Sequence, residues 1–352
     1  MNAKANRGNF FEDFATGMTI RHATPRTVTV GDVAVYNALY GARYAVTSSD
    51  PFAKALGFDR APVDDLLVFH IVFGKTVPDV SLNAVANLGY AECLFLTSVY
   101  PGDTLSAESE VVGVKENSSG KTGVVYMRTK GLNQNGAVVL SYARWVMVNK
   151  RDPSAPAPAP AVPEFAEVVD PGALEAPLPA ADVGSRYDYG FAGALHAFDD
   201  YEIGERIDHV DGVTLEEAEH QMATRLYQNT AKVHFNELEQ SASRFGRRLV
   251  YGGVVISLVR TLAFNGLENA FRILAINGGR HVAPTFAGDT VSAWSEVLDK
   301  RQLGTRDDVG AVRLRTIGLK NQPSGSFAGE AAGGKYEENV VVDLDYWVLI
   351  PR

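Results

Sequence analysis

The sequence contains an internal duplication, and this repeat limits the possible folds more than any other feature. Tyr40 and Tyr227 each end an amphipathic run. At the same offset, Val63 falls on Val250, within the matching segments PVDDLLVFHIVFG and LVYGGVVISLVRT. Further along the chain, PGDTLSAES is answered by AGDTVSAWS with the offset reduced by one. Both halves then close with a β-rich stretch, so the chain encodes one folding unit twice.

The boundary between the two units follows from composition. With 352 residues, the chain exceeds the usual size of a single domain. Residues 152–165 read DPSAPAPAPAVPEF, a Pro/Ala alternation that favours extended polyproline conformation. We therefore predict an N-terminal domain at 1–151, a linker at 152–198 and a C-terminal domain at 199–352.

Each half shows the same succession of elements. An opening strand leads to a helix, a loop, a second apolar segment and several strands with period-two alternation. Capping-box spacings at Thr29/Asp32 and Thr214/Glu217 predict where the first helix of each half begins. This pattern predicts an α+β fold in which an antiparallel sheet wraps around a central helix in each half. We expect the two sheets to join edge to edge, with a pocket where the halves meet, and the helix to face its sheet through Val33, Val35, Tyr36, Leu39 and Tyr40.

Composition argues against several classes of partner. A net charge of −9 and a pI near 5.3 disfavour nucleic acid and anionic membranes as partners. The N-terminus lacks the apolar core of a signal peptide, and the longest apolar runs are too short to cross a bilayer. The single cysteine, Cys93, fits a reducing compartment, so we expect a cytoplasmic protein.

Motifs for cofactors are missing from the sequence. It contains no His/Cys cluster at metal-ligand spacing, no Walker loop and no GxGxxG after a strand. A GxSxG elbow, which would suggest a serine hydrolase, is also missing. We therefore expect no metal and no nucleotide cofactor.

His234 is the strongest candidate for a catalytic side chain among the seven histidines. It lies in LYQNTAKVHFN, beyond the first helix of the second half, where its side chain can project between the halves. A catalytic and a structural role are both open for it. For the other six histidines a structural role is favoured: His22, His70, His196, His209, His220 and His281.

The segment from Asp211 to Phe264 resembles the MaoC-like, R-specific enoyl-CoA hydratase family. The family signature, Gly-Asp-x-Asn-Pro-x-His, places its His on His234 and its Asp on Asn229. Gln228 takes the Gly position, Ala231 and Lys232 replace Asn-Pro, and the later His-Gly of the family falls on Tyr251 and Gly252. The first half departs further, with Ala42 and Thr47 at the Asp and His positions.

This resemblance implies two tandem hotdog domains, of which the first is catalytically empty and shapes the acyl pocket. It also implies hydration of a small enoyl-coenzyme A thioester, with coenzyme A as part of the substrate and no separate cofactor. His234 would activate water, and Asn229 would orient that water through its carbonyl oxygen. Tyr227 and Tyr251 would belong to the substrate site.

Three further groups are candidates for the site. Asp64 and Asp65 could supply a second titrating group, although two acids after a proline are also typical of a helix start. Gly252 and Gly253 could donate backbone N–H groups to a developing oxyanion, or could only permit close helix packing. A closer resemblance within the family implies a substrate with a free carboxylate, for which the available cations are Arg225, Arg247, Arg248 and Arg280, with Arg248 and Arg280 retained as substrate-binding candidates.

Two other functions compete with hydration. A hotdog thioesterase would hydrolyse the thioester and release a free thiol. A non-catalytic acyl-CoA binding protein would explain the amide at Asn229, where the family has a carboxylate. We also expect a homo-oligomer, because hotdog sheets commonly associate.

Overall fold

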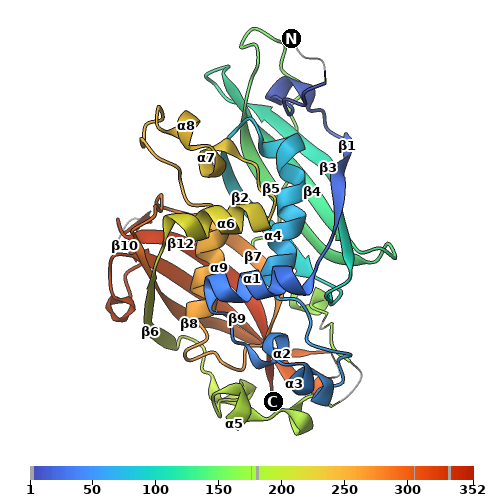
Figure 1. Ribbon diagram of the computed structural model, residues 1–352, viewed down its shortest axis with the longest axis vertical. Helices are drawn as coiled ribbons and strands as arrows, with labels where there is room; N and C mark the ends of the chain where they lie inside the picture. Colours follow the sequence, from blue (N-terminus) through green and yellow to red (C-terminus); the bar gives the residue numbers. More distant parts are fainter. Residues whose placement is uncertain (1–3, 176, 180–181, 305, 332–333) are drawn as a thin grey trace.

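One antiparallel sheet of ten strands forms the framework of the molecule (Figure 1). The computed structural model describes residues 4–175, 177–179, 182–304, 306–331 and 334–352. The strand order is β1-β3-β4-β5-β2-β7-β12-β9-β8-β6, so the two halves of the sheet mirror each other from opposite edges. Its strands are β1 (Thr19–Thr27), β2 (Ala84–Phe95), β3 (Thr104–Glu116), β4 (Thr122–Leu132), β5 (Val138–Asn149), β6 (Arg206–Thr214), β7 (Arg272–His281), β8 (Thr290–Leu303), β9 (Arg306–Lys320) and β12 (Val340–Pro351).

The two halves join through the antiparallel pairing of β2 with β7. Ala91 lies opposite Gly278, and Cys93 lies opposite Ile276. The predicted edge-to-edge association is confirmed, and so is the tandem α+β architecture with a sheet around a helix in each half. A small separate sheet pairs β10 (Glu330–Ala331) with β11 (Lys335–Tyr336).

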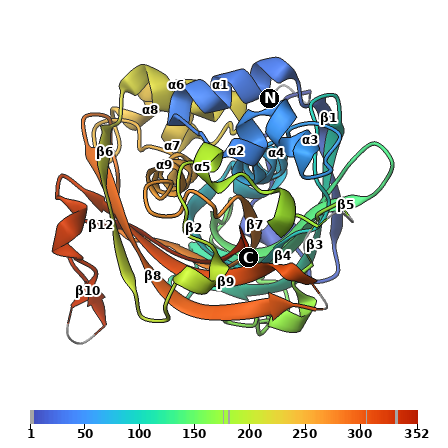
Figure 2. The ribbon, with the colours of Figure 1, turned by 90° about the horizontal axis from the view of Figure 1, so that it is seen from below.

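Two apolar helices lie inside the curve of the sheet, α4 (Asp65–Thr76) and α9 (Gly252–Leu262) (Figure 2). Every residue of α4 is buried, which explains why its sequence is apolar on all sides and shows no amphipathic period. The second helical pair, α1 (Val30–Tyr40) and α6 (Glu217–Leu226), covers α4 and α9 on the side away from the sheet.

The expectation that Val33, Val35, Tyr36, Leu39 and Tyr40 face the sheet is therefore wrong. These residues of α1 face the helical layer, where the Tyr36 hydroxyl donates to Ser257 Oγ of α9 at 3.1 Å. The central helix of each half is the second one, α4 or α9, which is buried along most or all of its length, whereas α1 buries only Tyr36 and Tyr40. The second helix takes the most enclosed position because it carries apolar residues on most of its surface.

One of the two predicted helix caps is confirmed and the other is wrong. Thr29 caps α1 and forms a capping box with Asp32. Thr214, however, is the last residue of β6, and its hydroxyl bonds that of Thr290 at 2.8 Å. It matches Thr27, which bonds Thr104 at 2.8 Å in the first half, so strand pairing uses the side chain that the spacing had assigned to a cap. The helix α6 begins after Glu216, which makes no side-chain cap bond, and α6 is not longer than α1.

Buried polar contacts repeat with the duplication inside each half, and one further contact joins the halves. His22 Nε2 bonds Ser109 Oγ at 2.7 Å, and His209 Nε2 bonds Ser295 Oγ at 2.7 Å. Where the two halves meet, the Tyr227 hydroxyl donates to the Tyr40 hydroxyl at 2.7 Å. These repeated buried bonds give the histidines at 22 and 209 a structural role.

The segment between the halves runs along the outside of the sheet as an extended chain. The Ala161 N–H donates to the Val114 carbonyl, and the Phe165 ring stacks on Trp145. Further along this segment, Val169, Leu174 and Val183 are buried in a core cluster that also contains Phe271 and Trp347 of the second half. Short helices complete the described chain: α2 (Ala45–Ser48), α3 (Asp50–Ala55), α5 (Tyr189–Ala192), α7 (Lys232–Phe235) and α8 (Glu237–Gln240). None of the helices in the described ranges combines the length and the apolar character needed to cross a membrane.

A buried ion pair joins α4 of the first half to β7 of the second. The Arg272 guanidinium donates to both carboxylate oxygens of Asp65, with Nη2 to Oδ1 at 2.6 Å, and the Ile273 N–H also donates to Asp65 at 2.9 Å. Both side chains are less than a tenth exposed. Asp65 is the ion-pair partner of Arg272, so losing it leaves the guanidinium charge buried without a counter-charge in contact.

We expect Asp65→Asn to lower the free energy of unfolding by about 3 kcal/mol or more, since the Arg272 charge would stay buried without its counter-charge. Urea unfolding followed by circular dichroism measures this change. Glu296→Gln serves as the matched control, because the Arg206–Glu296 pair is longer, at 3.7 Å, and its arginine side chain is 52% exposed. It should cost less than about 1 kcal/mol. Equal stability losses in the two variants would contradict the role given to Asp65.

Candidate active site

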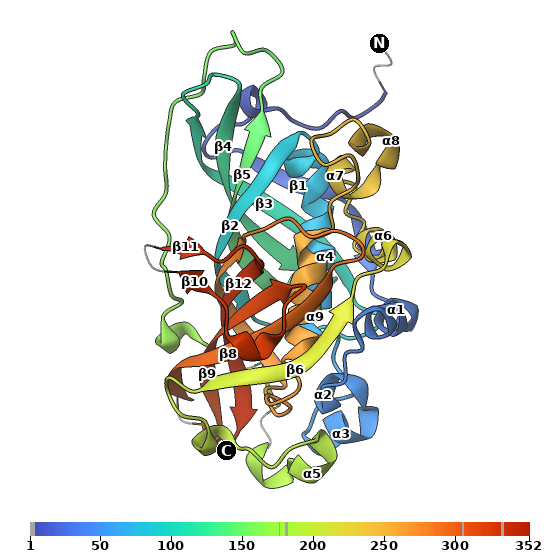
Figure 3. The same cartoon turned by 90° about the vertical axis from the view of Figure 1, so that its left-hand side faces the viewer.

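A cavity of about 770 Å³ lies where the two halves meet. The first half contributes the end of α4, the π-helical turn Val77–Ser81 and the start of β2. The second half contributes the segment of α7 and α8, the beginning of α9 and the end of β7. Figure 3 shows α7 and α8 next to α6, on the side of the molecule that carries the helices. A cavity of this size is typical of small-molecule sites.

His234 lines this cavity from α7. Its Nδ1 lies 2.9 Å from the Leu249 carbonyl oxygen, so Nδ1 carries the proton and donates it. Nε2 is then the basic atom, and it has no partner among the residues that the structure describes. Burial, opposed by the hydrogen bond to the Leu249 carbonyl and assisted by the positive charges of His220 and His281, lowers the pKa of His234 to about 4. The imidazole is therefore neutral at pH 7 and able to accept a proton.

Asn229 also lines the cavity and is buried. Its Oδ1 accepts from the Ala231 N–H at 3.1 Å, an Asx turn that leads the chain into α7. The sequence predicts that Asn229 orients water through its carbonyl oxygen, but this oxygen already accepts the hydrogen bond of the turn. Nδ2, a donor, is the side-chain atom left for a ligand.

The residue before Asn229 explains one feature of the family signature. Gln228 has a φ of 53°, in the left-handed region that favours glycine. The signature has Gly at this position. Here Lys75 of α4 donates to the Gln228 side chain and holds it against the first half.

His281 enters the same cavity from the end of β7. Burial lowers its pKa to about 4, and the Tyr90 hydroxyl lies 3.4 Å from its Nε2. A Cβ atom on Gly252 would come within 2.3 Å of this ring, so glycine is required for His281 to pack over the beginning of α9. The cavity thus holds two neutral imidazoles.

The remaining glycine and tyrosine candidates separate into two groups. Tyr251 and Gly252 line the cavity. Gly253 packs against His70 and Tyr251, and a Cβ atom there would come within 2.5 Å of the His70 ring. For Gly253 the structure therefore favours close helix packing over a role in binding an oxyanion. Tyr227 bonds Tyr40 behind the cavity and does not belong to its lining.

The acidic candidates lie at the far end of α4 from the cavity. Asp64 is the N-cap of that helix and accepts from the Leu66 N–H at 2.9 Å. Burial raises the pKa of Asp64, and the charge of Asp65 raises it further. Both acids thus lie at the start of a helix, as the second interpretation of their sequence predicted. Asp64 does not line the cavity.

None of the four candidate arginines lines the cavity. Arg248 pairs with Glu217 and Glu237. Arg280 is exposed beside Tyr336, and because it precedes His281 in the strand it faces the opposite side of the sheet. Arg247 lies over the Phe286 ring, and Arg225 contacts a carbonyl of its own helix.

Sequence reasoning missed His281 and two cations at the cavity wall, Lys232 and Arg244. His281 follows a Gly-Gly-Arg run with no motif around it, so only the pairing of β7 with its neighbours reveals it. The signal that could have found Lys232 was its position two residues before His234 on the same short helix.

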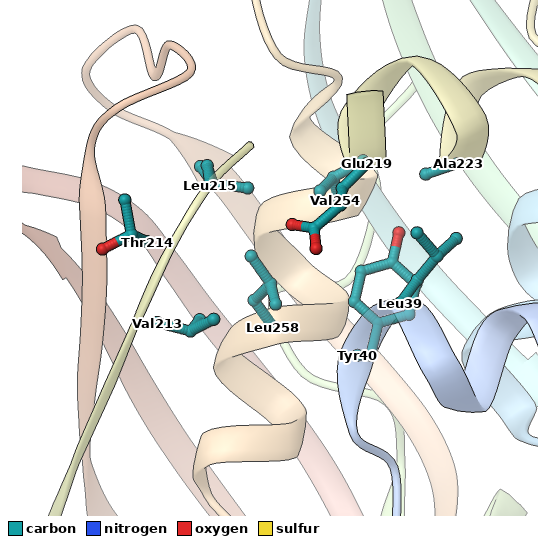
Figure 4. Close-up of a pocket in the computed structure, with 9 residues that line it drawn as sticks. All are labelled: Leu39, Tyr40, Val213, Thr214, Leu215, Glu219, Ala223, Val254 and Leu258. Atoms are coloured by element: carbon teal, nitrogen blue, oxygen red, sulfur yellow. The ribbon is translucent and has the colours of Figure 1, made fainter. Parts of the chain in front are cut away.

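A second hollow lies between α1, α6 and α9, lined by Leu39, Tyr40, Glu219 and Leu258 among others (Figure 4). Its volume is about 10 Å³, room for about one water molecule. The large cavity at the seam is therefore the candidate active site.

We expect the His234 ring to stay neutral well below pH 6.5, because burial disfavours its charged form. The unfolded chain binds this proton from about pH 6.5 downward, so His234 contributes full stability above pH 6.5 and weakens the fold as pH falls toward 4. Histidine NMR titration measures the midpoint, with a His234→Ala spectrum to assign the signal. A midpoint near 6.5 would show that the ring is solvated.

Comparison with known proteins agrees with this architecture and adds a family. Residues 2–333 match the sequence model of the mesaconyl-CoA hydratase family. The chain is 59% identical to a β-methylmalyl-CoA dehydratase of Chloroflexus aurantiacus, over 100% of this chain and 99% of that protein. It is also 59% identical to a mesaconyl-CoA hydratase of Cereibacter sphaeroides, over 99% of this chain and 100% of that protein.

Solved structures agree with the fold. A putative MaoC domain protein dehydratase from Chloroflexus aurantiacus superposes with a TM-score of 0.97 at 59% identity, covering 100% of this chain and 99% of that one. A conserved hypothetical protein from Mycobacterium tuberculosis with a double hotdog fold gives a TM-score of 0.74 at 23% identity, covering 98% and 99%. The predicted double hotdog fold is confirmed, and the chain belongs to the mesaconyl-CoA hydratase family.

Proposed function

We propose that this enzyme is a hydro-lyase that reversibly hydrates mesaconyl-CoA, or 2-methylfumaryl-CoA, to β-methylmalyl-CoA. The observation that carries the proposal is the His234 imidazole, which presents a free, neutral Nε2 to a cavity built from both repeats. Two relatives at 59% identity over the full chain bear the names of the two directions of this reaction, which supports the same substrate here.

The chemistry needs a base for water, a proton for the α-carbon and stabilisation of the thioester oxygen. His234 Nε2 accepts the proton of the water that adds to the β-carbon. His281 also lines the cavity, together with Glu239. Because both imidazoles are neutral, the proton that reaches the α-carbon is the one that His234 takes from the water. His281 relays this proton, in the role that the family signature gives to the carboxylate at the Asn229 position, so both rings end the addition neutral. This acid–base chemistry uses the substrate and water without a further cofactor.

Stabilisation of the thioester oxygen falls to the beginning of α9. Gly252 is the first residue of this 11-residue helix, and its N–H has no acceptor within the helix. It also lines the cavity. A backbone N–H at a helix N-terminus is suited to a developing oxyanion.

The coenzyme A portion would lie toward the charged side of the cavity. Lys232 and Arg244 lie in this lining, and both are suited to phosphate oxygens. Deeper lining residues such as Phe73, Val77 and Val255 are apolar and match the methyl-branched acyl group. We expect the enzyme to act in the cytoplasm as a homo-oligomer, as the sequence suggests.

His234→Ala should lower kcat/KM for mesaconyl-CoA by about 100-fold or more, because it removes the imidazole whose Nε2 accepts the proton of water. Loss of the enoyl-thioester absorbance measures the rate. His196→Ala is the matched control, since His196 is exposed and far from the cavity lining. A His234→Ala enzyme with wild-type turnover would remove His234 from the mechanism. Release of free thiol by the wild type, detected with a thiol-reactive dye, would instead indicate a thioesterase.

His281→Ala should lower kcat by about 10- to 100-fold with a smaller change in KM, because the proton to the α-carbon is needed only after substrate binds. The pH profile of kcat should lose one titration relative to the wild type. Gly252→Ala, which would push the His281 ring aside, should reproduce much of the loss. If His281→Ala keeps both kcat and the wild-type pH profile, His281 has no part in proton transfer.

A further inference from the structure

A fully buried arginine lies behind the inner wall of the active-site cavity. Arg144 is 0% exposed and points from β5 toward α4, with its guanidinium carbon 4.3 Å from the centre of the Phe73 ring. Across the sheet it stands directly opposite Tyr90. Two residues further along the same face of β5, Val146 lines the cavity.

The guanidinium of Arg144 lacks the partners that such a group needs. Nη2 donates to Thr76 Oγ1 at 2.7 Å, but Nε and Nη1 have no hydrogen-bond partner in the described parts of the chain. The same ranges contain no carboxylate within ion-pair distance of it. The other two buried arginines differ, since Arg272 pairs with Asp65 and Arg260 donates to the Tyr44 hydroxyl and the Ala270 carbonyl.

Two tyrosine hydroxyls beside Arg144 are also buried without a hydrogen-bond partner in the described parts of the chain. They are the hydroxyls of Tyr142 and Tyr251. Both rings pack on Phe73, with centres 6.4 Å and 5.8 Å from it. A buried charge and two buried hydroxyls without partners cost free energy, which a ligand able to accept from all three would offset. A carboxylate is such a ligand, because its two oxygens accept several hydrogen bonds at once.

The duplication shows that the fold itself does not need this arginine. The segment RWVMVNK of β5 corresponds to YWVLIPR of β12, so Tyr346 stands where the first half has Arg144. The Tyr346 hydroxyl and Thr316 Oγ1 bond each other at 3.0 Å, and that buried group is satisfied within the protein. The first half instead keeps a permanent positive charge. Val146 of β5, which lies in the cavity lining, is two residues from Arg144, whereas β12 reaches the lining through Val341, five residues from Tyr346.

The arginine is separated from the cavity by residues that line it. Three residues of the cavity lining lie close to the guanidinium: Phe73, Tyr90 and Tyr251. His234 lies 5.4 Å from Tyr251 between ring centres, and Tyr90 contacts His281. A group held by Arg144 would therefore lie next to both imidazoles.

We propose that Arg144, with the hydroxyls of Tyr142 and Tyr251, binds the free carboxylate of the substrate. This inference rests on the proposed function and specifies how that substrate is recognised. In mesaconyl-CoA the free carboxylate is bonded to the β-carbon, where water adds. Binding it beneath the two imidazoles fixes the β-carbon in reach of the water that His234 activates, and it selects thioesters of dicarboxylic acids over neutral ones.

The test compares two thioesters on three enzymes. Wild type, Arg144→Gln and Arg144→Lys are assayed with mesaconyl-CoA and with 2-methylcrotonyl-CoA, in which a methyl group replaces the carboxylate. We expect Arg144→Gln to lose about 100-fold or more in kcat/KM for mesaconyl-CoA and to change little with the neutral thioester, so that the preference for the carboxylate collapses. Arg144→Lys should recover part of the preference, because it keeps the charge and loses the bidentate geometry.

Stability and a matched control separate binding from folding. Arg128→Gln removes an arginine on the neighbouring strand that pairs outward with Glu92, and it should leave the preference unchanged. Arg144→Gln should melt at the wild-type temperature or above it, since it removes an unpaired buried charge, and mesaconyl-CoA should raise the melting temperature of the wild type but not that of the variant.

The outcomes distinguish this inference from the proposed function. If the wild type hydrates mesaconyl-CoA and folded Arg144→Gln keeps its preference for the carboxylate, the inference is overturned and the proposed function stands. If the wild type hydrates 2-methylcrotonyl-CoA as well as mesaconyl-CoA, the carboxylate is not recognised and the inference also fails. A wild type inactive on both thioesters would refute the proposed function, and the role of Arg144 would fall with it.

Discussion

The pairing of β2 with β7 is the interaction on which the rest of the structure depends. It turns two small curved sheets into one, and it brings α4 and α9 side by side within a single core. Neither half alone encloses the cavity, because the lining comes from both. The buried Asp65–Arg272 pair fixes α4 to β7 beside this junction, so the strand register and the helix position are set together.

The two halves share a framework and differ at the site. The duplicated His–Ser pairs at 22/109 and 209/295 and the Tyr40–Tyr227 bond are the same kind of contact on both sides of the seam. By contrast, His234, His281 and Arg144 occupy positions whose counterparts in the other half carry different chemistry, such as Thr47 and Tyr346. Duplication thus provides a stable scaffold twice, while the groups that we propose to act on the substrate are present once. The first half contributes part of the cavity wall, with Arg144 behind it.

Burial decides the chemistry of the imidazoles. His234 and His281 have their pKa values lowered to about 4, so both are neutral where an ordinary exposed histidine would be partly charged. The Leu249 carbonyl then selects the tautomer of His234 and leaves Nε2 basic. A neutral imidazole that is held in one orientation next to an apolar acyl pocket is suited to activating water.

The sequence by itself determined the duplication, the α+β architecture, the linker composition and the cap at Thr29, because these depend on local periodicity and side-chain type. It also named His234 and Asn229 as candidates from their match to the family signature, and both line the cavity. Only the tertiary structure decided that α4 and not α1 is the central helix, that Thr214 pairs with Thr290, and that His281 and Arg144 approach the same cavity. Those outcomes depend on strand register and on contacts between segments far apart in the chain, and a side chain's distant neighbours leave no trace in its local sequence.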